Sequence, residues 1–402
     1  MRKDVVGPAL VVGGLYALLL FSLFAIAHHD PRDFIELGRR YIERSQVSQA
    51  IRVDPSYPNY LVGDGYDGQF SYYIALDPLN ARYYIDAPVY RYERIGYPLF
   101  AWLLAAGQAP LIPYSMIAVN WLAATLGTLA AAARLRASGF SGWWATVFGL
   151  APGMYFALRR DLTDALAYAL VALAILPFYR GGSSRFPWSA IVFALAVLTR
   201  ETTAVFAVIF ALSWLWSPSP LRGGPGRGSQ GGLPLWGRAG WGLLYLIIAL
   251  GPWLLFRLFL VIWLHGLGST TPFEPLPFLG ILYYWPWSLR IRFEVLSIVL
   301  PALLVAVIAT TALFRRQITP LTVALLANVL LFVVFLNEAS FVELAASARI
   351  SLAVILPAIL AIPTLDRLGR WRYLGLALAA VLWLAPLPLV AFPPLGRALG
   401  MT

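Results

Sequence analysis

The hydrophobic positions of this chain fall in long unbroken runs rather than in the spaced pattern of a water-soluble protein. Most of the runs approach the roughly 20 residues that cross a bilayer as a helix. They do not alternate apolar with polar residues, which argues against membrane β-strands. The pattern predicts an all-α polytopic membrane protein with about 11 transmembrane helices. The predicted spans are residues 6–27, 113–133, 142–158, 162–178, 187–198, 202–216, 241–264, 295–314, 319–336, 350–365 and 373–392.

Two apolar runs are too short for ordinary spans. The run 96–107 ends shortly before Pro110, and we interpret it as an interfacial or re-entrant helix. The run 187–198 stops at Arg200-Glu201, and a further apolar run follows. This favours two half-length helices that meet at a charged elbow, with one unbroken helix as the alternative.

Two polar regions interrupt the apolar pattern. Residues 28–95 follow the first predicted span, and their charges are nearly balanced. Residues 217–240 are rich in Gly, Pro and Ser and are typical of a flexible linker. The linker lacks a GxxxxGK pattern, so its glycines do not indicate a nucleotide loop. We therefore treat residues 1–402 as a single integral membrane domain with one long loop and one linker.

Arginine placement gives the predicted helices an orientation. With the N-terminus in the cytoplasm, each loop that faces inward, including the linker, carries at least two arginines, as in the positive-inside rule. The loop at 28–95 then lies outside the cytoplasm. We read the net charge of +11 as a sign of this orientation and expect no nucleic-acid partner. The inward arginines are Arg134, Arg136, Arg180, Arg185, Arg222, Arg227, Arg238, Arg315, Arg316, Arg367, Arg370 and Arg372.

Charged residues also gather on the predicted outer side. Charges near membrane depth usually line a cavity or pair with one another. A shared polar cavity is one interpretation, and local salt bridges are the other, such as Arg160 with Asp164 one helical turn away. The clusters are Arg159, Arg160, Asp161 and Asp164; Arg200 and Glu201; Arg290, Arg292 and Glu294; and Glu338, Glu343 and Arg349.

The clearest candidate chemistry lies in the outer loop, where Asp64 and Asp67 alternate with glycines between residues 63 and 68. Glycines let the backbone turn sharply and approach a ligand. A carboxylate that faces a cavity is a reasonable general base for a hydroxyl group. The two carboxylates could also share a divalent cation. The structural alternative is that Asp67 only caps the helix that follows it.

The elements around Asp67 resemble those of membrane glycosyltransferases of the GT-C superfamily. Residues 66–76 read YDGQFSYYIAL, and residues 94–102 read RIGYPLFAW. They are similar to elements of the second mannosyltransferase of GPI-anchor synthesis and its bacterial relatives, with Tyr66 in place of a Trp and with a single Pro-Leu. Bacterial proteins assigned to surface-glycopolymer formation carry a closer element. The segments around Arg200 and Arg349 resemble two later arginine elements, so the likeness extends over most of the chain.

The resemblance implies a GT-C-like bundle that transfers a sugar from a polyprenyl-phosphate donor to an acceptor hydroxyl, with inversion, on the outer face. Asp67 matches the loop aspartate of the family and would be the base, with Asp64 as the alternative. Cations must neutralise the phosphate leaving group, and Arg349 and Arg200 are the leading candidates. The other residues assigned to substrate binding are Arg159, Arg160, Asp161, Asp164, Tyr66 and Gln69.

Several of these assignments have a structural alternative. Arg349 could be a snorkelling span terminus, and Asp161 and Asp164 could cap a helix. A transporter or flippase of lipid-linked sugars would use the same cavity without a base, and an accessory subunit of a membrane complex would need neither. For the enzyme, we expect the bacterial inner (plasma) membrane, an extracytoplasmic active site, and a lipid or glycan acceptor among membrane lipids.

Overall fold

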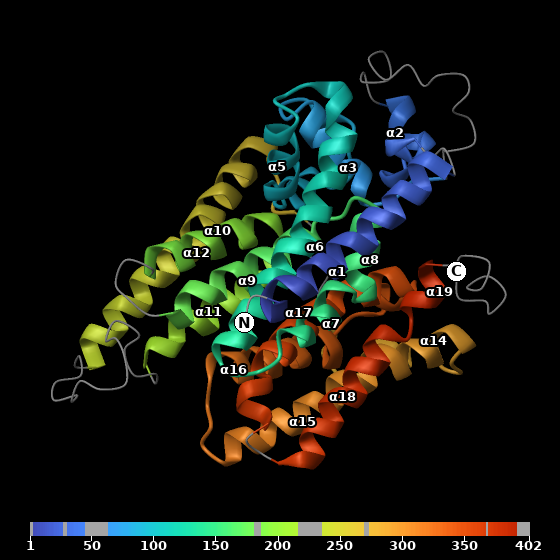
Figure 1. Ribbon diagram of the computed structural model, residues 1–402. Coiled ribbons are helices and arrows are strands. Elements are labelled where there is room, and N and C mark those ends of the chain that lie inside the picture. The colour runs from blue at the N-terminus through green and yellow to red at the C-terminus, as the bar shows by residue number, and fades with distance from the viewer. Residues whose placement is uncertain are drawn as a thin grey trace.

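The computed structural model describes residues 3–26, 30–44, 63–180, 186–215, 235–268, 273–366 and 369–391, and these residues form helices and turns without a strand (Figure 1). Six helical segments are long and apolar enough to cross a membrane, namely Lys3–Ala25, Ala109–Ala137, Ala239–Leu264, Leu289–Phe314, Leu344–Leu365 and Arg370–Ala391. The prediction of an all-helical membrane protein is therefore confirmed. Four further apolar helices are shorter, namely Asp164–Tyr179, Pro187–Thr199, Glu201–Leu215 and Pro320–Val334.

The predicted span at 142–158 is wrong as a continuous helix. It divides into α7 (Ala145–Gly149) and α8 (Pro152–Arg159), with Ala151 extended between them at ψ 141°. Proline disfavours the helical conformation of the residue before it, and its missing N–H is tolerated in the first helical turn. The run is therefore apolar throughout but begins a new helix at Pro152.

The predicted charged elbow is confirmed. Helix α10 (Phe186–Thr199) ends directly before Arg200, which is extended at φ −156°. A 3₁₀ turn at Glu201–Thr203 then leads into α11 (Ala204–Leu212). Helix α5 (Gly96–Leu104) has only nine residues, in agreement with the short helix predicted at 96–107. It packs so closely on the end of α10 that a Cβ on Gly96 would lie 2.3 Å from Oγ1 of Thr199.

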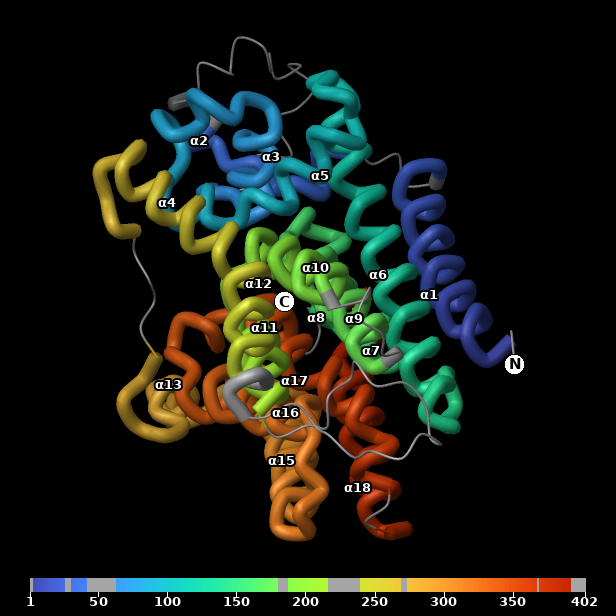
Figure 2. The backbone as a smooth tube through the Cα atoms, turned by 90° about the vertical axis from the view of Figure 1, so that its left-hand side faces the viewer, coloured from blue at the N-terminus to red at the C-terminus, as the bar shows by residue number. Residues whose placement is uncertain are grey.

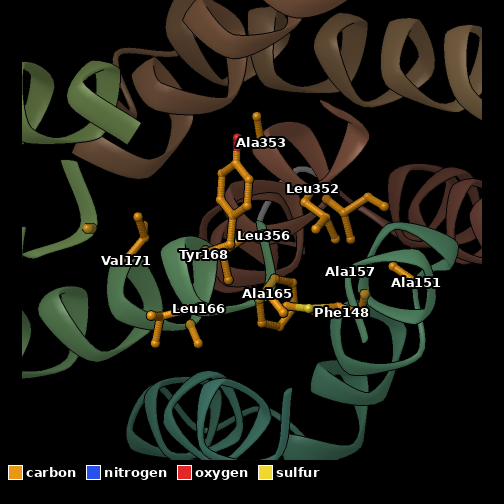
Figure 3. Close-up of a cluster of buried hydrophobic side chains, with 14 of the residues drawn as sticks. Phe148, Ala151, Ala157, Ala165, Leu166, Tyr168, Val171, Leu352, Ala353 and Leu356 are labelled. Atoms are coloured by element: carbon orange, nitrogen blue, oxygen red, sulfur yellow. The ribbon is translucent and has the colours of Figure 1, made fainter. Parts of the chain in front are cut away.

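The core of the bundle surrounds α17 (Leu344–Leu365). Of the 18 residues in the apolar stretch of this helix, 89% are buried. Figure 3 shows part of this core, where Leu352 and Leu356 of α17 lie near Phe148 of α7, Ala157 of α8 and Tyr168 of α9 (Asp164–Arg180). In contrast, only 11% of the 18 residues in the apolar stretch of α12 (Leu235–Leu264) are buried. A helix with so little protein around it is suited to face lipid.

Small residues set the spacing between several helices. A Cβ on Gly153 of α8 would lie 2.4 Å from the carbonyl oxygen of Ala348 in α17. Likewise, a Cβ on Gly127 of α6 (Ile112–Ala137) would lie 2.9 Å from the Cβ of Ala169 in α9. Such residues let membrane helices approach closely, where van der Waals packing replaces the hydrophobic effect as the source of association.

Short helices of the first long loop gather at one end of the bundle (Figure 2). They are α2 (Arg39–Arg44), α3 (Gly68–Leu76) and α4 (Pro88–Tyr92), and α5 lies beside them. Helix α3 contacts α5 and α6, and α4 contacts α12. Residues 28–29 and 45–62 of the loop and 217–234 of the predicted linker lie outside the described residues, and residues 235–240 belong to α12. The remaining helices include α15 (Leu300–Phe314), α16 (Pro320–Val329) and α18 (Arg370–Leu384).

We expect Gly153→Ala to destabilise the protein by about 1–3 kcal/mol, because its Cβ would collide with backbone rather than with a movable side chain. The matched control is Gly14→Ala in α1 (Lys3–Phe21), where a Cβ meets nothing within 4 Å. We expect the control to leave the protein unchanged or to stabilise it by up to about 1 kcal/mol. Thermal unfolding in detergent checks both, and equal melting temperatures for the two variants would contradict the proposed close contact.

Candidate active site

Glycines position the segment that carries Asp67. Gly65 has a φ of +73°, and a Cβ there would lie 2.4 Å from the backbone nitrogen of Gly38. A Cβ on Gly68 would lie 2.2 Å from the carbonyl oxygen of Arg160. The loop is therefore pressed between the segment before α2 and the turn after α8. Any larger residue at these positions would push Asp67 away from the bundle.

Gln69 fixes the same loop from within. Its side chain is buried, its amide oxygen accepts from the N–H of Gly38 at 3.0 Å, and its amide nitrogen donates to the carbonyl oxygen of Asp64 at 2.8 Å. The structure thus places Gln69 in support of the loop and outside the lining of the pocket around Asp67. Asp64 itself is exposed and does not line that pocket either.

Asp67 stands at the N-cap position of α3, but its side chain caps no backbone N–H. The capping alternative is therefore wrong for this side chain. Its carboxylate instead contacts Nη1 of Arg91 at 2.9 Å and Nη1 of Arg349 at 3.5 Å. Burial raises the pKa of Asp67, but Arg349 and Arg91 outweigh that effect and hold the pKa well below its ordinary value. The low pKa keeps the carboxylate ionised. Its side chain is 37% exposed and can therefore be reached from the pocket.

Asp164 lies behind Asp67 and is fully buried at the start of α9. It contacts Nη1 of Arg200 at 2.8 Å and Nε of Arg349 at 3.3 Å. These contacts are ionic but lack the alignment of hydrogen bonds, so the oxygens of Asp164 keep acceptor capacity. Arg349 consequently joins two carboxylates that come from distant parts of the chain. Arg349 is therefore buried and paired with two carboxylates, and it does not reach toward the membrane surface as a snorkelling side chain would.

The local salt bridge suggested between Arg160 and Asp164 is wrong. Helix α8 ends at Arg159, Asp161 adopts a left-handed conformation at φ +48°, and α9 begins at Asp164, five residues after the end of α8. The two side chains therefore do not share one helix face. Arg160 pairs with Glu36 at 3.3 Å and with Glu343 at 3.2 Å instead.

A narrow pocket lies beside Asp67, with a free volume of about 20 Å³, which is room for about one water molecule. Four arginines and two aspartates are among its lining residues, so the lining side chains carry an excess of positive charge. Arg200 comes from the elbow after α10, and Arg91 comes from α4. The residues that line it are Asp67, Phe70, Ser71, Arg91, Arg94, Leu162, Thr163, Asp164, Arg200 and Arg349.

The sequence reasoning missed Arg91 and Arg94. Arg91 also binds Asp86 at 2.7 Å, and Arg94 holds the two carboxylate oxygens of Glu201 at 3.0 and 2.7 Å. Their spacing of three residues places both on one side of a helical turn. That spacing was the available signal, but nothing in the sequence says that this turn faces Asp67.

Tyr66 lies at the edge of the site. Its hydroxyl donates to the carboxylate of Glu343 and accepts from Nη1 of Arg349 at 3.3 Å. The guanidinium of Arg160 lies 4.2 Å from the centre of the tyrosine ring. Tyr66 therefore links the loop to the start of α17 and to the turn after α8, next to the Asp67 pair.

Two other predicted residues lie away from the pocket. Arg159 donates to the carbonyl oxygen of Asp33 at 3.2 Å and stacks over the ring of Phe34 at 5.0 Å. Asp161 is fully buried and accepts from the hydroxyl of Tyr97 at 3.3 Å. Burial raises the pKa of Asp161 well above its usual range. These two residues shape the turn that supports the site.

The surroundings of Asp67 disfavour the divalent cation suggested for Asp64 and Asp67. Asp67 is engaged by two guanidinium groups, and a dication would have to approach the same oxygens against their charge. Among the described residues, no three side chains of the metal-ligating kind lie together. We therefore assign no metal to the pocket.

We expect Gln69→Leu to destabilise the protein by about 1–3 kcal/mol, because it leaves the buried N–H of Gly38 without a partner and removes the hydrogen bond to the carbonyl of Asp64. The control is Asp64→Ala, a change to an exposed side chain of the same loop, for which we expect less than about 0.5 kcal/mol. Denaturant or thermal unfolding of the purified protein measures both. A neutral Gln69→Leu variant would contradict the supporting role of this amide.

The depressed pKa of Asp67 predicts a pH dependence of stability. A group of this kind stabilises the folded state above its unfolded pKa of about 3.9 and loses that effect as the pH falls further. The melting temperature of the wild type should therefore exceed that of Asp67→Asn at pH 7. The difference should shrink as the pH falls from about 4 to about 3. A constant difference over this range would show that the ion pairs do not exist as described.

No protein-family model matches the chain, and neither does any curated protein or solved structure. The comparisons therefore assign no family to it. Any functional interpretation depends on the geometry around Asp67 and on the resemblance of the short sequence elements that surround it.

Proposed function

We propose that this protein is a glycosyltransferase of the GT-C type that uses a polyprenyl-phosphate-linked sugar donor. The observation that carries the proposal is one exposed carboxylate, Asp67, in a pocket whose other charged groups are mainly arginines. Charged side chains at membrane depth are costly and are usually retained for function. A base beside phosphate-binding groups is the combination that sugar transfer from a lipid phosphate requires.

The arginines suit the leaving group of this reaction. When the glycosidic bond to the donor breaks, the phosphate oxygen gains negative charge, and guanidinium groups bind such oxygens in a planar fork. Arg349 and Arg200 are both largely buried, and each already contacts Asp164. Because the protein holds them in place beforehand, they can stabilise the developing charge without reorganisation.

Asp67 is the proposed general base. In the resting protein, two arginines make it a weak base. A donor phosphate that binds these arginines would offset their charge and raise the proton affinity of the carboxylate. Asp67 then takes the proton of the acceptor hydroxyl, and the hydroxyl oxygen bonds to the anomeric carbon. The bond from that carbon to the phosphate oxygen breaks, and the lipid phosphate leaves with the electron pair.

The bundle is compatible with the arrangement that this function needs. Six helices are long and apolar enough to cross a membrane, and we propose that the four shorter apolar helices complete the membrane bundle. We propose that the end carrying α3, α4 and α5 faces the outside of a bacterial inner membrane. The donor tail is confined to the bilayer, so a pocket near one end of the spans is where donor phosphate and acceptor can meet. A lipid or glycan hydroxyl is the proposed acceptor.

We expect Asp67→Asn to reduce sugar transfer by about 10²–10⁴-fold, because the amide cannot accept the proton. The measurement uses full-length protein in lipid nanodiscs, a panel of radiolabelled polyprenyl-phosphate sugars, and lipid and glycan extracts of the bacterial envelope as acceptors. The control is Asp77→Asn at the other end of α3, whose carboxylate binds Asn80 and does not line the pocket.

Asp64→Asn distinguishes the two loop carboxylates. Because Asp64 lies outside the pocket lining, this variant should retain most of the activity. Full turnover by Asp67→Asn together with loss of activity in Asp64→Asn would contradict the assignment of the base. Movement of the labelled lipid across the bilayer without a new glycosidic product would support a transporter instead.

A further inference from the structure

A second cavity borders α4, as the Asp67 pocket does. It has a free volume of about 530 Å³ and opens widely to the surroundings. Pro88 and Val89 of α4 line this cavity, whereas Arg91 of the same helix lines the pocket of Asp67. One short helix therefore borders both spaces. We call the second space the α4–α12 groove, and it is lined by Arg82, Tyr83, Ala87, Pro88, Val89, Trp263, Leu264, His265, Gly266 and Gly268.

Arg82 gives this groove a positive charge that lacks a counter-ion. Its guanidinium lies 4.7 Å from the ring centre of Trp263 and 4.6 Å from that of Tyr83, and Nη2 donates to the hydroxyl of Tyr83 at 2.6 Å. Its Nε is buried without a hydrogen-bond partner. Among the described residues, Arg82 makes no ion pair, in contrast to Arg91 and Arg94. A buried donor on an unpaired cation favours an anionic ligand.

The side of the groove formed by α12 is apolar and continues along the helix. Leu255, Leu258 and Ile262 are 69%, 58% and 65% exposed, and their spacing places them on one helix face. Trp263 at the groove lies about 100° round the helix from Ile262. It stacks on the neighbouring Phe259 with ring centres 5.6 Å apart and packs edge-on against Tyr92 of α4 with ring centres 5.3 Å apart. Aromatic residues of this kind are typical of the membrane–water interface.

We propose that the α4–α12 groove binds a phosphate-bearing membrane lipid, with its phosphate at Arg82 and its hydrocarbon chains along the exposed face of α12. A single cation at an open groove makes a weak site for a free anion. The long apolar face beside it supplies the additional affinity that only a lipid can use. The proposal is separate from sugar transfer, because none of its contacts involves Asp67 or Arg349.

Helix α4 connects the groove to the Asp67 pocket, because its residues line both spaces. Arg91 and Asp86 flank the part of α4 that lines the groove, and Arg91 reaches Asp67 at 2.9 Å. A lipid in the groove would thus lie one helix away from the charged pocket.

The test measures lipid binding to the full-length protein in detergent by native mass spectrometry. The probes are phosphatidylglycerol, phosphatidylcholine and inorganic phosphate, and the variants are Arg82→Gln and Arg82→Lys. We expect Arg82→Gln to weaken phosphatidylglycerol binding by about five- to tenfold, with an intermediate loss for Arg82→Lys. Phosphatidylcholine should bind less well to the wild type, and inorganic phosphate should not compete at millimolar concentration.

The matched control is Arg40→Gln, which removes an exposed arginine 5.8 Å from the ring of Tyr41 in the same loop region. This variant should bind phosphatidylglycerol as the wild type does. Asp67→Asn should also bind it normally, which separates this inference from the proposed function. Unchanged binding in a folded Arg82→Gln variant would overturn the proposal. Equal affinity for the two phospholipids, or competition by inorganic phosphate, would overturn it as well.

Discussion

The arrangement of the site depends on one buried guanidinium group. Arg349 projects from α17, the most enclosed of the long helices, and is itself only 7% exposed. A buried cation is costly unless opposite charge surrounds it. Asp67 and Asp164 provide that charge from two other parts of the chain. The first long loop, the start of α9 and the centre of the bundle are therefore held in one relative position.

The same pairing links stability to the proposed chemistry. Asp67 balances Arg349 and Arg91 in the resting protein, and the same carboxylate is the proposed base. An incoming phosphate would take over part of this balancing role. The carboxylate would then be freed for proton transfer at the moment when the donor is bound. A single electrostatic exchange thus accounts for both the low basicity of the resting site and its activation.

Short helices of the first long loop border two spaces of different character. In one, charged groups from four regions converge in a narrow pocket. In the other, a wider groove combines Arg82 with the apolar end of α12. Glycines at the loop and at the start of α5 allow this layer to lie directly on the helix ends. The close packing explains how a polar loop forms walls for both spaces.

The hydrophobic pattern by itself determined the helical membrane class, the elbow at Arg200 and the presence of Asp67 in a tight glycine loop, because these follow from run length and local backbone preference. Only the tertiary structure decided which charges meet. Arg160 and Asp164 are neighbours in sequence, yet a left-handed residue between them sends one to Glu343 and the other to Arg349. Ion pairs across a bundle depend on helix positions set by packing, and the local sequence does not contain that information.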